Sequence, residues 1–284
     1  MSETVSQVFT PAEFRDLACD IALGAGELVR TQRAELAGED RLDADTKSSI
    51  VDPVTVVDKA SEKYIVGRIS AERPLDGIVG EEGADKSSTS GVQWIVDPID
   101  GTVNFLYGLP VYAVSIGVAI HGELVAGAVL NVATGELYLG ARGEGASVRR
   151  NGKTAPLQAS HVTDTEQALV ATGFGYTARR REAQAQILTT LLPKVRDIRR
   201  MGAAALDLCR VAEGHVDAYY EHGLHPWDYA AGAVIAREAG CGVVVPELDV
   251  SGVEGRLVVV TAPGITNNFR ALVEESGASQ NLPH

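Results

Sequence analysis

One stretch, Trp94–Pro110 (WIVDPIDGTVNFLYGLP), constrains the fold more than any other part of the sequence. It opens with the apolar run Trp94–Val96, which predicts a buried strand. Two carboxylates three residues apart follow, Asp97 and Asp100, and Pro98 between them keeps the residue before it out of the helical region. We therefore expect the chain to bend where the strand ends and both carboxylates to point into one cavity.

The residues after this pair predict a place for an anion. Gly101 allows close backbone approach, and a helix that begins here would aim its free N–H groups at the same cavity. An Asp-Pro-x-Asp-Gly string by itself is usually a surface turn. Here the preceding strand is too apolar for the surface, and further acids, among them Glu81, Glu82 and Asp228, occur in similar settings. The combination suits a phosphate ester bridged by metal ions.

Three segments resemble the signature segments of the inositol monophosphatase family, which belongs to the Mg²⁺-dependent, lithium-sensitive sugar phosphatases. They are WIVDPIDGTVNF at 94–105, GEEG at 80–83 and PWDYAAG at 226–232, in the family's order. The resemblance covers roughly residues 10–275. It implies a mixed α+β fold, the layered α/β/α/β/α sandwich, and a homodimer. It also implies in-line attack of water on a phosphate monoester, without a covalent intermediate.

Composition argues against several classes of partner. The 284 residues include 25 basic and 38 acidic side chains, a net charge of −13. Nucleic acid is therefore not expected as a partner, because phosphate binding needs basic surface. No apolar run reaches the roughly 18 residues of a membrane span, and no secretory leader pattern is present. The cysteines at 19, 209 and 241 are widely spaced, which predicts buried free thiols and a cytoplasmic location.

Hydrophobic periodicity predicts the elements around the motif. A Thr10–Glu13 capping box begins a helix that ends near 33–36, and a second helix covers about 56–71. A short strand at 77–80 delivers Glu81. An antiparallel meander follows, with strands at 112–120, 124–132, 137–141 and 146–150. Its first strand has a small-residue face that includes Gly117.

Beyond residue 160 strands and helices alternate, which implies layers of sheet and helix. The expected strands are 168–173, 197–200, 215–221, 242–245 and 257–261, and the expected helices are 179–194, 202–213, 227–239 and 265–275. We divide the chain into an N-terminal half at 1–155 with the metal-binding motifs and a C-terminal half at 156–275 that completes the active site. Residues 276–284 are expected to be a disordered tail.

Four of the acids predict a magnesium site if they converge. Two carboxylates ~4 Å apart repel by about 4 kcal/mol at an effective dielectric of 20, so such a cluster needs protons or cations. Oxygen ligands without His or Cys favour Mg²⁺ over Zn²⁺. The family resemblance implies one Mg²⁺ on Glu81, Asp97 and the Ile99 carbonyl. A second would lie on Asp97, Asp100 and Asp228, and a third, weaker ion on Glu81 and waters.

The resemblance also implies catalytic roles. Thr102 and Glu81 would orient and deprotonate the attacking water. Asp58 would lie near the metal site and hold a metal-bound water, although a simple helix-dipole partner is the alternative. Lys47, at the end of the polar loop 37–49, would approach the active site, whereas a lysine in such a loop is usually solvated.

Substrate contacts are expected from both halves. The backbone N–H groups of Gly101 and Thr102 would hold a phosphate oxygen. Glu221 resembles the family's acid that contacts a substrate hydroxyl, and a polyol with vicinal hydroxyls suits such an acceptor; a strand-end acid is the alternative. Gly202 and Ala203 match the family's small-residue segment on the substrate side. Asp100 and Asp228 are expected to face the substrate as well.

These interpretations predict a Mg²⁺-dependent phosphomonoesterase that acts on a small phosphorylated polyol, with myo-inositol 1-phosphate as the leading substrate. A related phosphatase for histidinol phosphate, fructose 1,6-bisphosphate or a nucleotide 3′-phosphate stays open. So does a regulatory or binding protein on the same scaffold. The lack of a strongly basic substrate-side segment disfavours the bisphosphates. A serine nucleophile is not indicated, because no Gly-x-Ser-x-Gly elbow occurs.

Overall fold

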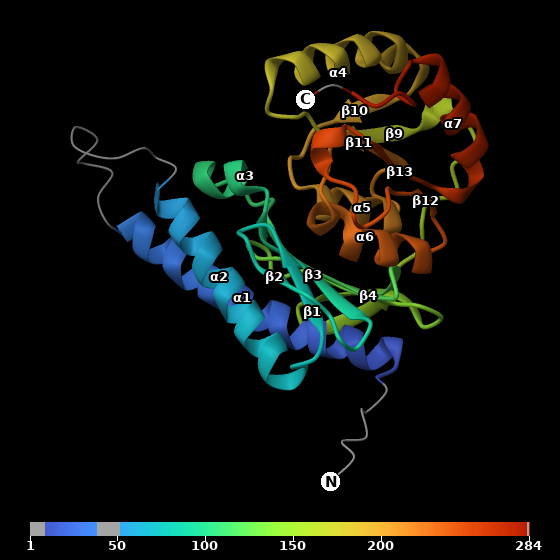
Figure 1. The fold of residues 1–284 in the computed structure, drawn as a ribbon. Helices are drawn as coiled ribbons and strands as arrows, with labels where there is room; N and C mark the ends of the chain where they lie inside the picture. The colour runs from blue at the N-terminus through green and yellow to red at the C-terminus, as the bar shows by residue number, and fades with distance from the viewer. Residues whose placement is uncertain (1–8, 39–51, 283) are drawn as a thin grey trace, which may run out of the picture.

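The computed structural model describes residues 9–38, 52–282 and 284. Its elements stack in five layers (Figure 1). Helices α1 and α2 cover the outer face of a first sheet, α5 and α6 lie between this sheet and a second one, and α4 and α7 cover the second sheet's outer face. The α/β/α/β/α sandwich predicted from the sequence is confirmed.

The helices agree with the predicted ones to within a few residues. In the described part of the chain they are α1 (Pro11–Gly38), α2 (Asp52–Glu72), α3 (Thr102–Tyr107), α4 (Ala178–Leu191), α5 (Ala204–Ala212), α6 (Pro226–Glu238) and α7 (Thr266–Glu275). Single 3₁₀ turns occur at Thr165–Gln167, Leu192–Lys194, Gly252–Glu254 and Pro263–Ile265. Lys47 lies outside the described residues.

The first sheet has eight strands in the order β2-β1-β3-β4-β5-β6-β7-β8. They are β1 (Gly77–Gly80), β2 (Asp85–Lys86), β3 (Val92–Asp100), β4 (Ala113–Ile120), β5 (Glu123–Asn131), β6 (Leu137–Ala141), β7 (Gly145–Arg150) and β8 (Lys153–Pro156). The predicted meander is confirmed and is longer than expected, because β8 was not predicted. The two-residue strand β2 lies in the segment expected to be a loop.

The second sheet has five strands in the order β10-β9-β11-β13-β12. They are β9 (Leu169–Thr172), β10 (Asp197–Arg199), β11 (Ala218–His222), β12 (Gly242–Val244) and β13 (Leu257–Thr261). Because the first sheet ends at Pro156 and the second begins at Leu169, we keep the division near residue 155 as a proposal.

Helix α1 begins at the predicted capping box. The backbone N–H of Thr10 donates to the Glu13 carboxylate at 2.7 Å, and the Glu13 N–H donates to the Thr10 hydroxyl at 3.3 Å. These bonds satisfy two of the N–H groups that a helix start leaves unpaired. The apolar stripe of α1, with Phe14, Ile21 and Ala25, is buried against the first sheet.

Small residues let α6 pack closely on the first sheet. Gly117, Gly127 and Gly140 lie on three neighbouring strands below this helix. A β-carbon on Gly117 would lie 2.8 Å from the Ala230 β-carbon, and one on Gly127 would lie 2.5 Å from the Ala231 carbonyl oxygen. Packing at this distance fixes the helix that carries the Trp-Asp motif against the sheet.

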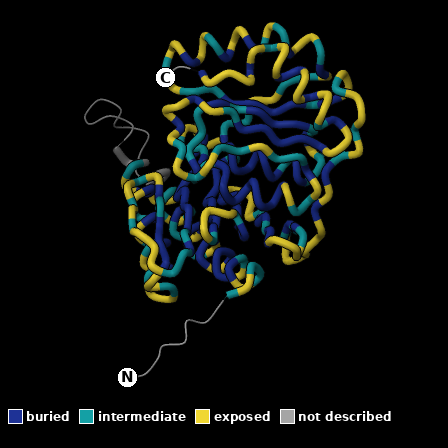
Figure 2. Tube along the Cα trace, turned by 45° about the vertical axis from the view of Figure 1, so that its right-hand side comes forward, coloured by how far each residue is buried: buried dark blue, intermediate teal, exposed yellow. Residues whose placement is uncertain are grey.

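Burial follows the layers, with buried residues concentrated between them (Figure 2). The three cysteines are free and buried, as predicted. No helix in the described ranges is long and apolar enough to cross a lipid bilayer. The C-terminal residues differ from the expected disordered tail, because Ala278 is fully buried and Leu282 is only 8% exposed.

Candidate active site

The four acids singled out in the sequence line one cavity of about 420 Å³. Glu81 directly follows β1, Asp97 and Asp100 end β3, and Asp228 lies in the first turn of α6. Strands β1 and β3 are parallel, and the N–H of Glu81 bonds the Val96 carbonyl at 3.3 Å. Parallel pairing therefore brings the carboxyl ends of both strands to the same edge.

A bulge in β3 turns its two aspartates. We expected the strand to end before Asp97, but it continues to Asp100. Asp97 lies opposite Ser115 and Asp100 opposite Ala113, so β3 has one residue more than β4 across this interval. Bulges bend a strand and re-aim its side chains, and they are one of the few places where a sheet accepts proline. The bend predicted from Pro98 is therefore present, within the strand.

Backbone N–H groups hold the three aspartates in place. Asp97 accepts from the Ile99 N–H at 2.9 Å, and Asp228 accepts from the His225 N–H at 2.7 Å. Asp100 accepts from two N–H groups at the start of α5. Each carboxylate is thus oriented by the backbone while keeping lone pairs for a further partner.

Crowding raises the pKa values of these carboxyls. Burial raises the pKa of Asp97 well above its usual range, and the charges of Glu81, Asp100 and Asp228 raise it further. Burial and the charge of Asp100 act in the same direction on the pKa of Asp228. The pKa of Asp100 rises to about 7, mainly through burial. Such a cluster is stabilised by protons or by a cation.

The donor set fits Mg²⁺ by its chemistry. The four acids and the Ile99 carbonyl offer oxygen ligands alone, which suits a hard cation, although three histidines, His222, His225 and His284, also line the cavity. Among the residues described, no three acidic, histidine or cysteine side chains already enclose one point as a metal cage would. An ion here would therefore need small rotations of these side chains, and Mg²⁺ usually keeps several waters as ligands.

Asp58 lies next to this cluster on α2. It is 4% exposed, and its Oδ1 atom has no hydrogen-bond partner among the described residues. Burial and the charges of Glu82, Glu81 and Glu62 raise its pKa to about 8. A buried carboxyl oxygen without a partner requires water, a proton or a cation beside it. A simple helix-dipole partner, the alternative for Asp58, would not explain a buried oxygen of this kind.

Glu62 was missed in the sequence and supports the turn after β1. Its carboxylate accepts from the N–H groups of Glu82 at 2.9 Å and Ala84 at 3.0 Å. It thereby fixes the backbone on which Glu81 stands. Its place on α2, one turn after Asp58, was the available signal.

The predicted anion-binding half lies in the same cavity. Gly101 and Thr102 line it, and Gly101 caps α3 with φ of 89°. Only glycine takes this conformation at little cost. The Thr102 hydroxyl donates to the Ile99 carbonyl at 3.1 Å, which joins the residue expected to orient water to an expected metal ligand.

The substrate-side residues also line the cavity: Gly202, Ala203 and Glu221. Burial raises the pKa of Glu221 to about 7, and the Tyr219 hydroxyl donates to its carboxylate at 2.6 Å. Gly173, not singled out in the sequence, gives this carboxylate room, because a β-carbon there would overlap it.

Two arginines that the sequence analysis did not single out line the cavity, Arg180 and Arg200. Arg200 lies close enough to Glu221 for its charge to lower that group's pKa, against the larger effect of burial. The signal for Arg200 was its position two residues before Gly202. Arg200 therefore adds a basic group on this side of the cavity that the sequence analysis did not count, whereas the Arg180 guanidinium donates to backbone carbonyls.

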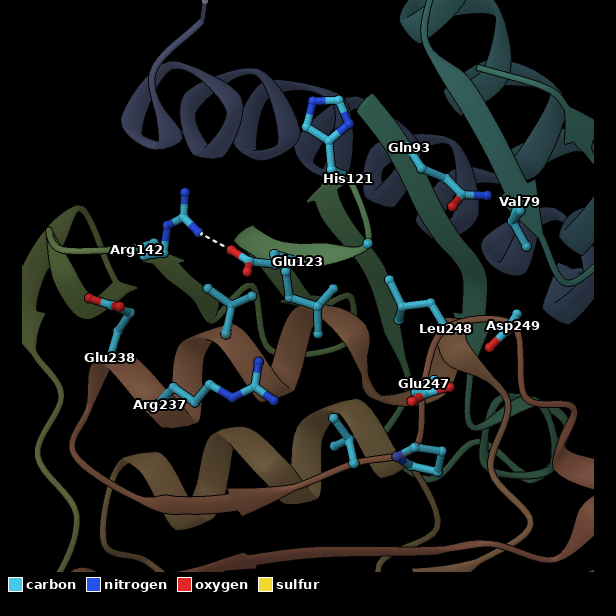
Figure 3. Close-up of a pocket in the computed structure, with 15 residues that line it drawn as sticks. Val79, Gln93, His121, Glu123, Arg142, Arg237, Glu238, Glu247, Leu248 and Asp249 are labelled. Carbon is cyan, nitrogen blue, oxygen red and sulfur yellow. Dashed lines mark hydrogen bonds and ion pairs between the residues drawn. The ribbon is translucent and has the colours of Figure 1, made fainter. Parts of the chain in front are cut away.

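A second, larger cavity of about 870 Å³ lies at the other end of α6 (Figure 3). Its acids are spread around it, and two of them already have partners. Glu123 pairs with Arg142 at 2.8 Å, and Glu238 accepts from the N–H groups of Gly143 and Gly145. The acids of the sequence motifs gather in the smaller cavity instead.

A profile of the inositol monophosphatase family matches residues 10–278. The inositol-1-monophosphatase SuhB of Mycobacterium tuberculosis is 46% identical over 283 residues, which is 96% of this chain and 97% of that protein. The protein named Nus factor SuhB of Vibrio cholerae is 37% identical, covering 84% of this chain and 88% of that one.

A solved structure of Mycobacterium tuberculosis SuhB superposes on this chain with a TM-score of 0.83. The two sequences are 44% identical, and the match covers 96% of this chain and all of that one. Sequence and structure therefore agree over nearly the full length.

Proposed function

Because this chain belongs to the inositol monophosphatase family, we propose that it is a Mg²⁺-dependent phosphomonoesterase that converts myo-inositol 1-phosphate to myo-inositol and phosphate. The observation that carries the proposal is one cavity with two halves. Four acids that suit cations, Glu81, Asp97, Asp100 and Asp228, lie beside the glycine-capped start of α3, which suits an anion.

We assign the metal ligands as the sequence predicts, to two or three Mg²⁺ ions. Glu81, Asp97 and the Ile99 carbonyl hold one, and Asp97, Asp100 and Asp228 hold another. Bound Mg²⁺ would polarise phosphoryl oxygens and lower the pKa of a coordinated water. The raised pKa values of these carboxyls support the assignment, because burial and the neighbouring negative charges raise them and a bound divalent cation offsets both.

The chain's own residues orient the reactants. Thr102 accepts a hydrogen bond from the attacking water at its hydroxyl oxygen, while its own hydroxyl donates to the Ile99 carbonyl. Glu81 takes the proton from this water as general base, and its raised pKa suits the role. The N–H groups of Gly101 and Thr102 bind a phosphate oxygen, and Asp58 holds a water next to Glu81.

The wall of the cavity that contains Glu221 binds the polyol portion of the substrate. Glu221 accepts a hydrogen bond from a substrate hydroxyl, and Gly202 and Ala203 leave room for the ring. We further propose a cytoplasmic homodimer that Li⁺ inhibits by competing with one Mg²⁺, with no membrane or nucleic acid partner. Family membership and the buried free thiols support this part.

The test is phosphate release across inositol 1-phosphate, histidinol phosphate, fructose 1,6-bisphosphate and a nucleotide 3′-phosphate, each with and without Mg²⁺. We expect the highest kcat/KM on inositol 1-phosphate and none without the metal. A higher kcat/KM on another substrate would reassign the specificity. Absence of Mg²⁺-dependent release from all four would instead favour a regulatory or binding protein, a role that the name of the Vibrio cholerae relative suggests for that protein.

A further inference from the structure

The C-terminal residues 277–282 dock onto the wall of the cavity that faces the substrate. The Leu282 N–H donates to the Gly255 carbonyl at 3.0 Å, and the Ala278 N–H donates to the Val273 carbonyl at 2.9 Å. The side chains of Ala278 and Leu282 are buried in the cluster that covers the second sheet. Paired backbone groups and buried side chains are the marks of a docked segment.

Arg180 joins this segment to the cavity. Its guanidinium donates to the carbonyls of Gly252 at 3.1 Å, Val253 at 3.0 Å and Leu282 at 3.5 Å. Arg180, Gly252 and Val253 all line the cavity. Gly223, another lining residue, has no room for a β-carbon because the guanidinium occupies that place. One cation thus fastens the segment to the wall loop that contains Gly252 and Val253.

His222 makes a second connection. Its Nε2 atom lies 2.7 Å from the Ala278 carbonyl, and since a carbonyl only accepts, Nε2 carries the proton. His222 is 1% exposed and directly follows Glu221 on β11. A displacement of Ala278 would therefore act through His222 on the neighbouring Glu221, whose carboxylate is assigned to the substrate hydroxyl. Asp97 and Asp100 are held by other contacts, to Ile99 and to the start of α5.

We propose that residues 277–282, the C-terminal brace, support the substrate-binding wall from behind and thereby set the affinity for the polyol portion of the substrate. The brace holds Arg180, Gly223 and Gly252–Val253 in place, while Asp97 and Asp100 are held by contacts that do not involve it. This inference rests on the proposed phosphatase activity, and it adds positioning residues that act through Arg180 and Glu221.

Gly255 offers a specific way to release the brace. It has a φ of 66°, and a β-carbon there would overlap the Leu282 carbonyl oxygen. Gly255→Ala therefore pushes the brace away, in addition to a backbone strain of about 1 kcal/mol. Gly135→Ala is the matched control, because Gly135 has a φ of 76° and open space around its β-carbon position.

The kinetic test compares two substrates. In Gly255→Ala we expect KM for inositol 1-phosphate to rise about tenfold, with kcat and the Mg²⁺ requirement within about twofold of the parent. KM for p-nitrophenyl phosphate, which has no polyol, should not change. Gly135→Ala should leave both values unchanged. An unchanged KM for inositol 1-phosphate in Gly255→Ala would overturn the proposal.

A second variant and a readout without substrate complete the test. A chain that ends at Ala278 keeps the bond to His222 and loses the contacts of Leu282. In both variants we expect amide hydrogen exchange at Gly223 to rise at least about tenfold over Gly135→Ala. Unchanged exchange in both would also overturn the brace. If the parent enzyme does not hydrolyse inositol 1-phosphate, the proposed function fails, while the exchange measurement still decides whether the brace holds the wall.

Discussion

The carboxylate of Asp100, at the end of the first sheet, accepts a 2.7 Å hydrogen bond from the backbone N–H of Ala205, in the first turn of α5. Its other oxygen accepts from the neighbouring Ala204 N–H at 3.2 Å. A proposed metal ligand is therefore also the cap of a helix in the next layer. The field of that helix start favours a negative charge at this point.

Asp100→Asn should separate these two roles. The amide keeps one oxygen for the Ala205 N–H and removes a charge from a crowded cluster. We expect phosphate release to fall about a thousandfold or more, because a metal ligand is lost. We expect the Mg²⁺-free variant to unfold at the same or a higher temperature than the parent at pH 8.

Asp85→Asn, at an exposed acid on the same sheet, is the control and should leave phosphate release and the unfolding temperature unchanged. Turnover at the parent rate in Asp100→Asn would contradict the ligand assignment.

Mg²⁺ binding should release protons below neutral pH. Burial is the main cause that raises the pKa of Asp100 to about 7, so this carboxyl is mostly protonated at pH 6 in the metal-free protein. A metal ion must displace that proton, and its apparent affinity should therefore fall as the pH drops below about 7. Titration calorimetry in two buffers of different ionisation enthalpy measures the proton count. A count of zero at pH 6 would refute the raised pKa.

The same shift predicts how stability depends on pH without metal. The folded state holds the Asp100 proton more tightly than the unfolded state, where the carboxyl has its ordinary pKa of 3.8. The free energy of unfolding should therefore fall as the pH rises from about 4 to 7, through this group. Saturating Mg²⁺ should remove the fall. Thermal unfolding of the parent and of Asp100→Asn across this pH range checks the prediction. If the parent gained stability relative to Asp100→Asn as the pH rose, the prediction would have the wrong sign.

Thr102→Val should slow the chemical step. It removes the hydroxyl that bonds the Ile99 carbonyl and keeps the shape of the side chain. We expect kcat to fall about a hundredfold with little change in thermal stability, in line with the usual contribution of proton transfer by a positioned group. Thr154→Val, at an exposed position of β8, is the control. If kcat stayed within a factor of two, Thr102 would have no part in orienting water.

His222 should make the protein sensitive to acid. Burial lowers its pKa to about 4 from the ordinary histidine value of 6.5. The folded state therefore disfavours the protonated ring, and stability is lost as the pH falls from 6.5 to 4, by about 3 kcal/mol in total. His222→Gln, which cannot take up this proton, should flatten that part of the curve. His161→Gln, at an exposed histidine, should not. Parallel curves for the parent and His222→Gln would contradict the lowered pKa.

Periodicity and motif spacing predicted most helices and strands and the acids that line the cavity, and the family resemblance implied the five-layer arrangement. Local patterns carried that information, as in the capping box at Thr10 and the alternation around Gly117. The bulge around Pro98 could not be located in this way, because a bulge depends on register with the neighbouring strand. Arg180 was missed for a related reason, since its role depends on carbonyls 72 and 102 residues further along the chain.

The packing of the C-terminal residues could not be predicted from local sequence patterns either. Ser276–His284 reads as polar and irregular, and only contacts with Gly255, His222 and Arg180 reveal that residues 277–282 pack. Glu62 was likewise missed, because a glutamate on a helix surface usually faces solvent, whereas this one accepts two N–H groups of the turn that carries Glu81.

The most direct test of the central claim is anomalous X-ray scattering from a crystal of this protein soaked in Mn²⁺, which takes similar oxygen ligands to Mg²⁺. We predict at least two anomalous peaks within coordination distance of Asp97, one shared with Glu81 and one with Asp100 and Asp228. Peaks elsewhere, or none at a Mn²⁺ concentration that supports phosphate release, would contradict the account.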